Sequence, residues 1–211
     1  GGYFGHFNGT LAGRVGAGTT SFECATLMAP EHLVDYDGLA MTKVAFIPAD
    51  PFTEFKVFIY DVVSGLPLDS TDAIDGATFP ADMLNQWHEV ELPNPIMIDA
   101  TQPLMFGYRV TGIEDPDGNF PAGADTGPAL QGYGDLIKGF GADWGSMAYQ
   151  YGDGTGAFDY NWAIEGYATF ADGRSLSSME PVEIPISVGG NSVLESREMT
   201  NPISVSHPIS R

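Results

Sequence analysis

The sequence predicts an all-β fold, and three observations carry that prediction. Successive side chains of a strand point to opposite faces, so apolar residues at every second position mark one buried side. Four segments show this alternation, and Gly, Pro and Asp-Gly turn residues separate them. No stretch has the sustained three-to-four-residue apolar repeat and caps of a long helix. The four segments are Met41–Ile47, Phe55–Asp61, Trp87–Leu92 and Leu104–Val110.

The other elements follow in chain order. Gly1–Thr20 is rich in glycine, and its aromatic residues could anchor an edge strand. Phe22–Met28 reads as the first core strand. Met41–Ile47 and Phe55–Asp61 lie close enough in sequence to form a hairpin. Ser64–Gln86 is a long loop of the kind that is usually functional or mobile.

The second half of the chain is harder to divide. We expect Pro93–Asp99 to cross between sheets, and Leu136–Lys138 and Ser146–Tyr149 to be short strands. Trp162–Phe170 closes the domain, with Trp162, Ile164 and Ala168 inward and Glu165, Tyr167 and Thr169 outward. The predicted core of two packed antiparallel sheets is Phe46, Val57, Ile59, Val90, Leu104, Phe106, Trp162 and Ile164.

One domain suffices for 211 residues, and we place it at residues 1–171. Residues 173–211 contain no aromatic residue and too little apolar mass to form a core alone. Residues 172–211 are therefore interpreted as a linker or C-terminal tail, and a pair of edge strands docked on the domain is the alternative.

Charge restricts the partners. The chain has 8 Lys and Arg against 28 Asp and Glu, a formal net charge of −20. Nucleic acid and anionic membranes would be repelled, because their binding depends on Lys and Arg. The single cysteine, Cys24, can form no disulfide within the chain and reads as a small buried apolar residue. No apolar run approaches membrane-spanning length. The chain begins Gly1-Gly2 without Met, and we expect that a secretion signal was removed.

Several pieces, taken in order from about Val15 to Phe170, resemble one known family. They are Phe22 with Ala25, Tyr36–Gly38, Thr42–Val44, Val57–Tyr60, Trp87–Leu92 with Pro95, Ile96, Ile98 and Asp99, Gly107–Tyr108, Phe120–Ala122 with Asp125 and Gly127–Ala129, and Asn161–Ile164 with Gly166–Tyr167. In this order and spacing they are similar to the cleaved-adhesin modules of Bacteroidetes surface proteins, including the gingipain and hemagglutinin proteins.

The resemblance implies a jelly-roll β-sandwich similar to galactose-binding-type domains, secreted or surface-bound. It also implies structural calcium, and binding rather than catalysis. The sequence departs from the family at its N-terminus, where Tyr3–Gly9 stands in place of the usual acidic motif.

Three acidic loops are candidate calcium sites. Asp115, Asp117 and Asn119 place oxygen side chains at alternate positions, as in the first half of an EF-hand loop. Phe120 then occupies the position that needs glycine, and Asp-Pro-Asp-Gly is equally good turn chemistry. Asp153 lies in a second, glycine-rich loop, and Asp35 with Asp37 precedes a core strand. Any of the three could be a solvated turn.

Four aromatic residues of the glycine-rich region are candidate ligand contacts: Trp144, Tyr149, Tyr151 and Tyr160. Aromatic faces on loops suit sugar rings, whose C–H surfaces stack on them. Core packing is the alternative reading for each.

The sequence shows no His-Glu-x-x-His metal motif, no Gly-x-Ser-x-Gly elbow and no phosphate-binding loop. We therefore expect a non-catalytic, secreted or cell-surface binding module for a glycan or an extracellular host protein. It would be a monomer or part of a multidomain chain. A carbohydrate-active or peptidase-associated enzyme using paired acids and a structural stalk module stay open as alternatives.

Overall fold

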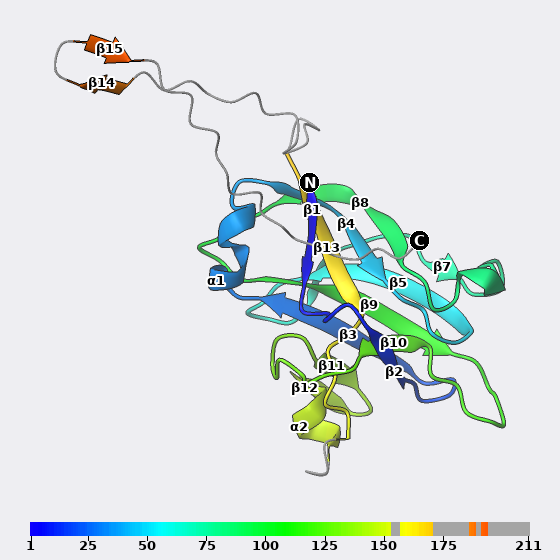
Figure 1. Cartoon of the computed structure of the whole chain (residues 1–211). Helices are drawn as coiled ribbons and strands as arrows, with labels where there is room; N and C mark the ends of the chain where they lie inside the picture. Colours follow the sequence, from blue (N-terminus) through cyan, green and yellow to red (C-terminus); the bar gives the residue numbers. More distant parts are fainter. Residues whose placement is uncertain (153–156, 171–185, 189–190, 194–211) are drawn as a thin grey trace.

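The computed structural model describes residues 1–152, 157–170, 186–188 and 191–193. Strands hold 48% and helices 9% of these residues, and the sheets are antiparallel, so the all-β prediction is confirmed (Figure 1). The strands are β1 (Gly2–Gly5), β2 (Leu11–Val15), β3 (Ser21–Met28), β4 (Ala40–Phe46), β5 (Phe52–Tyr60), β6 (Pro67–Ser70), β7 (Ile74–Asp75), β8 (His88–Met97), β9 (Leu104–Gly112), β10 (Ala122–Asp125), β11 (Leu136–Gly139), β12 (Ala142–Ser146), β13 (Ile164–Thr169), β14 (Ile186–Val188) and β15 (Asn191–Val193). The helical turns are α1 (Pro30–Leu33), η1 (Val34–Tyr36), η2 (Ala81–Met83) and α2 (Met147–Tyr151).

Two sheets enclose the core. One has four strands in the order β1-β13-β4-β8. The other runs β12-β11-β3-β9-β5-β6, with β7 also paired to β5. A separate ribbon of β10 and β2 is joined by isolated bridges to Pro48 and Trp162, beyond the ends of β4 and β13. The strands β14 and β15 pair with each other.

Aromatic side chains from both sheets meet in the core. The rings of Phe46 on β4 and Phe55 on β5 stack with centroids 4.3 Å apart, and the ring of Tyr108 on β9 packs against both. The buried Trp162 donates its indole N–H to the carbonyl of Leu136 at 2.8 Å. Of the predicted core residues, Phe46, Val57, Ile59, Phe106, Trp162 and Ile164 are fully buried, while Val90 and Leu104 are partly buried and pack against the core. Cys24 is buried as predicted.

The predicted hairpin between Met41–Ile47 and Phe55–Asp61 is wrong. The strands β4 and β5 belong to different sheets: β4 pairs with β13 and β8, and β5 pairs with β9 and with the nearby β6 and β7. Sequence proximity favours a hairpin, but the stacked pair Phe46 and Phe55 faces across the core instead of lying side by side in one sheet.

The predicted crossing at Pro93–Asp99 begins later than expected. Strand β8 continues through Pro93 and Pro95 to Met97, which pairs with Ala40. Because β8 is an edge strand, a proline there need not interrupt a ladder on both sides. The chain crosses to the other sheet between the end of β8 and the start of β9 at Leu104.

Three further expectations need correction. The strand expected at residues 146–149 is wrong: β12 ends at Ser146, which caps helix α2 by accepting the backbone N–H of Tyr149 at 3.3 Å. Glu165 does not point to solvent, since only 3% of it is exposed. The loop expected at Ser64–Gln86 contains strands β6 and β7, both paired to β5. Leu136–Lys138 is a strand as predicted, within β11.

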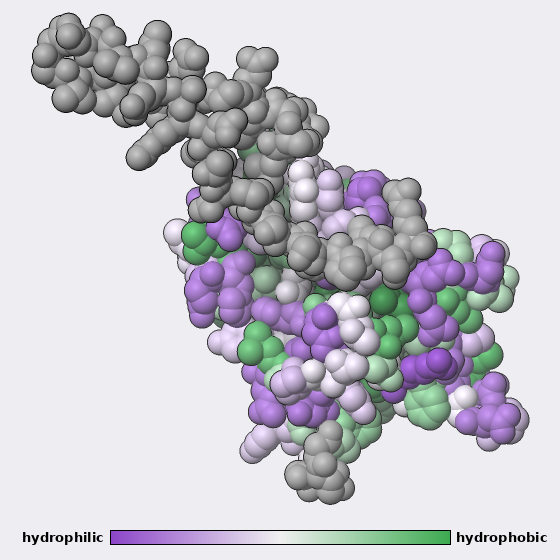
Figure 2. Space-filling model, viewed as in Figure 1, coloured by the Kyte–Doolittle hydropathy of each residue, from purple (hydrophilic) through white to green (hydrophobic). Residues whose placement is uncertain are grey.

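Figure 2 shows the domain surface from the same side as Figure 1, with hydrophilic and hydrophobic residues interspersed. The side of the seven-stranded sheet that faces away from the four-stranded sheet carries an apolar cluster of its own.

Candidate functional site

The side of the seven-stranded sheet turned away from the core, here called the outer face, carries a second apolar cluster. One face of an antiparallel sheet commonly contacts water and is polar. Here the buried members are Ala25, Phe58, Tyr60, Met105 and Leu136, packed against the partly buried Leu27, Val62 and Trp144. This cluster is separate from the main core.

Strand register brings these residues together. Phe58 pairs with Gly107, Gly107 with Ala25, and Ala25 with Leu136, so four strands contribute one row across the sheet. The next row pairs Tyr60 with Met105 and Met105 with Leu27. Alternation within each strand thus gives the sheet apolar residues on both sides in this region.

Trp144 on β12 covers one side of the cluster. Its indole N–H donates to the carbonyl of Gly65 at 2.8 Å, and its ring meets that of Tyr60 edge-on with centroids 5.0 Å apart. A Cβ on Gly65 would lie 2.6 Å from Trp144 Cδ1, so the close approach requires glycine at that position. The Lys138 ammonium lies 5.9 Å from the centre of the same ring.

A tight turn between β5 and β6 forms the opposite wall. The Asp61 carboxylate accepts the Ser64 backbone N–H at 2.6 Å, and the Asp61 carbonyl accepts that of Gly65 at 2.7 Å. The hydrogen bonds from Ser64 lower the pKa of Asp61, which therefore stays ionised. The turn holds Val63 almost fully in solvent, with 98% of it exposed.

Between this turn and Trp144 lies a pocket of about 240 Å³, here called the outer pocket. It is lined by Leu27, Val62, Val63, Ser64, Gly65, Met105, Leu136, Asp143 and Trp144. Strand pairing and the hydrogen bonds of the turn and of Trp144 hold the groups that form its walls.

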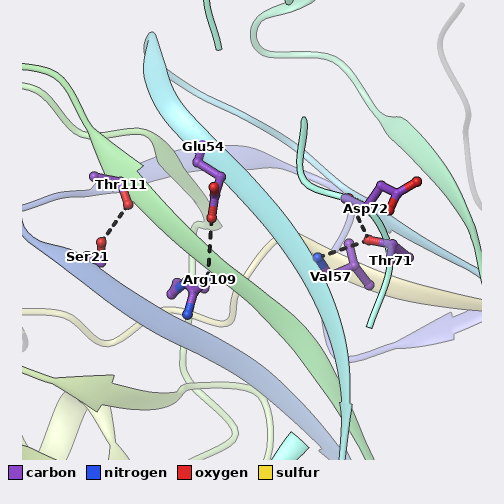
Figure 3. A network of polar contacts seen from close by, with 7 residues as sticks. All are labelled: Ser21, Glu54, Val57, Thr71, Asp72, Arg109 and Thr111. Atoms are coloured by element: carbon purple, nitrogen blue, oxygen red, sulfur yellow. Dashed lines mark hydrogen bonds and ion pairs between the residues drawn. The ribbon is translucent and has the colours of Figure 1, made fainter. Parts of the chain in front are cut away.

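A row of charged side chains crosses the outer face beside the apolar rows. The register aligns Lys138, Glu23, Arg109 and Lys56 on four neighbouring strands. Arg109 also pairs with Glu54 at 3.4 Å, as Figure 3 shows next to the hydrogen-bonded Ser21 and Thr111. Burial and the nearby Glu23 carboxylate raise the pKa of Tyr60, so its hydroxyl stays protonated.

Thr71, which follows β6, connects the chain to β5 through its side-chain hydroxyl. The Thr71 hydroxyl accepts the Val57 backbone N–H at 3.3 Å and donates to the Asp72 carbonyl at 3.1 Å (Figure 3).

Of the four aromatic residues predicted to contact ligand, only Trp144 lines this pocket. Tyr149 is 83% exposed on α2. The Tyr151 hydroxyl donates to the Gly139 carbonyl at 3.3 Å, and its ring packs on Phe140. Tyr160 is partly buried against the main core.

The residues proposed for calcium are already engaged within the protein or exposed. The Asn119 side chain is buried, accepts the Ile113 backbone N–H and donates to the Pro51 carbonyl. The Asp115 carboxylate accepts the Asp117 backbone N–H at 2.8 Å, and both residues are exposed.

In the candidate segment before β4, Asp35 is exposed and the Asp37 carboxylate accepts the Ala100 backbone N–H at 2.9 Å. Asp153 lies outside the described residues. Within the part of the chain that the structure describes, no three His, Cys, Asp or Glu side chains gather as a metal site.

Sequence reasoning missed a buried polar network near the β10–β11 connection. Asp125 is fully buried and accepts four hydrogen bonds, from the backbone N–H groups of Asn8, Gly127 and Asn161 and from the Asn161 side chain. Asp135, also fully buried, accepts the backbone N–H groups of Gly132 and Ala148 and the Ser146 hydroxyl. A local Asp-x-Gly pattern is a turn signal, but nothing in it indicates burial.

Comparison of the chain with protein-family models, with curated proteins and with solved structures finds no match. Among the described residues, no helix is both long and apolar enough to cross a bilayer.

Proposed function

We propose that the chain is a non-catalytic binding module of a secreted or cell-surface protein, adhesin-like and of the jelly-roll, galactose-binding-like class. The observation that carries the proposal is the outer pocket, with its apolar cluster and adjoining charged row on a single sheet face. Buried aromatic and aliphatic anchors surrounded by polar groups are the composition of protein and ligand binding sites.

The construction of the pocket supports binding by a preorganised surface. Strand register sets the floor, and the Trp144–Gly65 hydrogen bond joins the two walls. A site that is rigid before the ligand arrives loses little conformational entropy on binding.

The buried acids support a binding role over hydrolysis by paired carboxylates. Asp125 and Asp135 have no exposed surface, and their oxygens accept backbone and side-chain hydrogen bonds. Both carboxylates hold a loop in place and are closed off from solvent. A catalytic acid–base pair, in contrast, needs carboxyl groups that can reach a substrate.

A binding screen tests the proposal. The purified chain is applied to a glycan array and to a panel of extracellular-matrix proteins, together with the Trp144→Ala and Tyr149→Ala variants. We expect binding that Trp144→Ala removes and Tyr149→Ala retains, because Tyr149 lies outside the pocket. Loss through Tyr149→Ala alone would place the ligand on α2.

Two other results would change the assignment. Turnover of any polysaccharide or peptide by the purified chain would make it an enzyme. Failure to bind any glycan or matrix protein would favour a stalk module.

A further inference from the structure

We infer that the outer pocket receives an apolar side chain of a polypeptide partner, and that the partner carries basic residues beside that side chain. The inference rests on the proposed function and names the class of ligand. It follows from the pocket lining, its rim and its charge.

The lining is mostly apolar. Leu27, Val62, Val63, Met105, Leu136 and Trp144 supply apolar side chains. The volume of about 240 Å³ is below the roughly 300–1,000 Å³ of pockets that enclose a whole drug-sized ligand. A single side chain the size of Leu, Met or Phe suits this space.

Apart from the exposed Asp143 carboxylate, the polar groups of the lining named here are already hydrogen-bonded within the protein. The Trp144 indole N–H donates to Gly65, the Ser64 N–H donates to Asp61, and the Ser64 hydroxyl accepts the Leu66 N–H at 3.3 Å. A sugar needs partners for its hydroxyls, and an unpaired polar group costs free energy when it is buried. The lining therefore favours an apolar side chain over a sugar ring.

The rim adds apolar contact area. Val63 is 98% exposed, and Leu66 and Leu68 follow on the same hairpin with 57% and 68% exposed. Large exposed apolar patches mark interaction sites, and Val63 is the member of this group that also lines the pocket.

Charge indicates basic residues in the partner. Asp143 lines the pocket with a side chain 86% exposed, and Asp61, kept ionised by Ser64, begins the turn whose residues 62–65 line the opposite wall. Lys138 lies 3.6 Å from Asp143 and offsets part of this charge. In the adjoining row, Arg109 is paired with Glu54, and Lys56 is the further cation aligned on this face. The net charge of −20 over the whole chain would also speed the approach of a basic partner.

A displayed random-peptide library, selected on the full chain, tests the inference. Counter-selection on the Trp144→Ala chain removes peptides that bind only through charge, because that variant keeps every acidic residue. We expect the enriched peptides to share one large apolar residue with Lys or Arg within a few positions. A synthetic enriched peptide should bind at least about tenfold more weakly to Trp144→Ala, as at interface hot spots.

Two milder variants separate the apolar contribution to peptide binding from the electrostatic one. Val63→Ser should weaken the same peptide without altering the fold, because the side chain makes almost no internal contact. Asp143→Asn should weaken it and reduce its salt dependence. Tyr149→Ala should leave affinity unchanged, and thermal melts of each variant check folding.

The outcomes distinguish this inference from the proposed function. If glycans bind in a Trp144-dependent manner and no peptide is enriched over the counter-target, the module binds and the peptide assignment is overturned. Enrichment of acidic peptides would overturn the charge argument. Absence of glycan, matrix-protein and peptide binding would overturn both proposals.

Discussion

Individual buried residues fix the loop that precedes β11. Asp125 accepts four hydrogen bonds while fully buried, and Asn161 connects it to the Leu130 N–H at 2.7 Å and the Pro128 carbonyl at 3.1 Å. A buried carboxylate is tolerated only when such donors replace water. One acid thus connects the N-terminal segment at Asn8 to the chain before β13.

Replacing Asp125 with Asn should destabilise the domain by at least about 2 kcal/mol, because the new amide N–H₂ faces backbone donors and leaves them unpaired. Urea unfolding measures the change. Asp72→Asn is the matched control, since Asp72 is exposed, and should alter stability by less than about 0.5 kcal/mol. Equal effects of the two variants would contradict the structural role of Asp125.

Three rings from different segments form a second residue-level feature. His6 follows β1, His32 lies on α1, and their ring centroids are 5.0 Å apart, with Tyr133 packed against both. The His6 Nε2 lies 3.0 Å from the Leu27 carbonyl and donates to it. Burial, together with the neighbouring His32, lowers the pKa of His6 below its ordinary value of 6.5.

This depressed pKa predicts a loss of stability in mild acid. As the pH falls through 6.5, His6 of the unfolded chain binds a proton, whereas folded His6 does so only at lower pH. Protonation therefore stabilises the unfolded state, and the free energy of unfolding decreases. Partial burial of His88 acts in the same direction. Urea unfolding at pH 7.5 and 5.5 should show this loss, and His6→Asn should reduce it. An unchanged pH dependence in His6→Asn would exclude this contribution.

At the scale of elements, the β5–β6 turn and strand β12 are joined through Gly65 and Trp144. Gly65 adopts φ +64°, a conformation that side chains disfavour, and also contacts the Trp144 ring. Gly65→Ala should therefore lower stability by about 1–2 kcal/mol, combining left-handed strain with a steric clash. Gly18→Ala is the control for strain alone, because Gly18 has φ +56° and open space around its Cβ position. Equal melting midpoints for Gly65→Ala and Gly18→Ala would mean that the Trp144 ring moves away from the added methyl group without loss of stability.

The loop after β9 tests the calcium hypothesis. If Asp115 and Asp117 ligate a structural ion, calcium binds the folded state selectively and raises the melting temperature. Asp115→Asn combined with Asp117→Asn should abolish the rise, and magnesium should substitute poorly because it requires tighter octahedral geometry. Identical melts with calcium and with a chelator would leave these carboxylates as solubilising charge.

For the whole molecule, the main core draws on elements from β1 to β13. Phe4 near the N-terminus and Ala168 near the end of β13 are both buried in it. The domain boundary at residue 171 therefore predicts that a chain of residues 1–171 folds cooperatively with the melting temperature of the full chain. Thermal unfolding of both chains measures this. A midpoint several degrees lower in the shorter chain would show that residues 172–211 contribute to the domain.

Local patterns in the sequence determined the strands and most of the core. Alternation at Phe55, Val57 and Ile59 identified β5 and its inward face, because side-chain direction in a strand depends only on neighbouring residues. The same reasoning located β3, β4, β8, β9 and β13. It failed at residues 147–149, which follow the end of β12 and belong to a single helical turn too short to show a periodic pattern.

Only the tertiary structure decided strand partners and the candidate site. Pairing joins residues far apart in the chain, so the sequence placed β4 and β5 in a hairpin although they lie in opposite sheets. Trp144 was recognised as a possible contact from its type and loop context. Its partners Gly65 and Tyr60 could not be, because they are about 80 positions away and meet it only when β5 and β12 are brought to the same face. The pocket exists through that long-range register, which is specified by packing of the whole sheet.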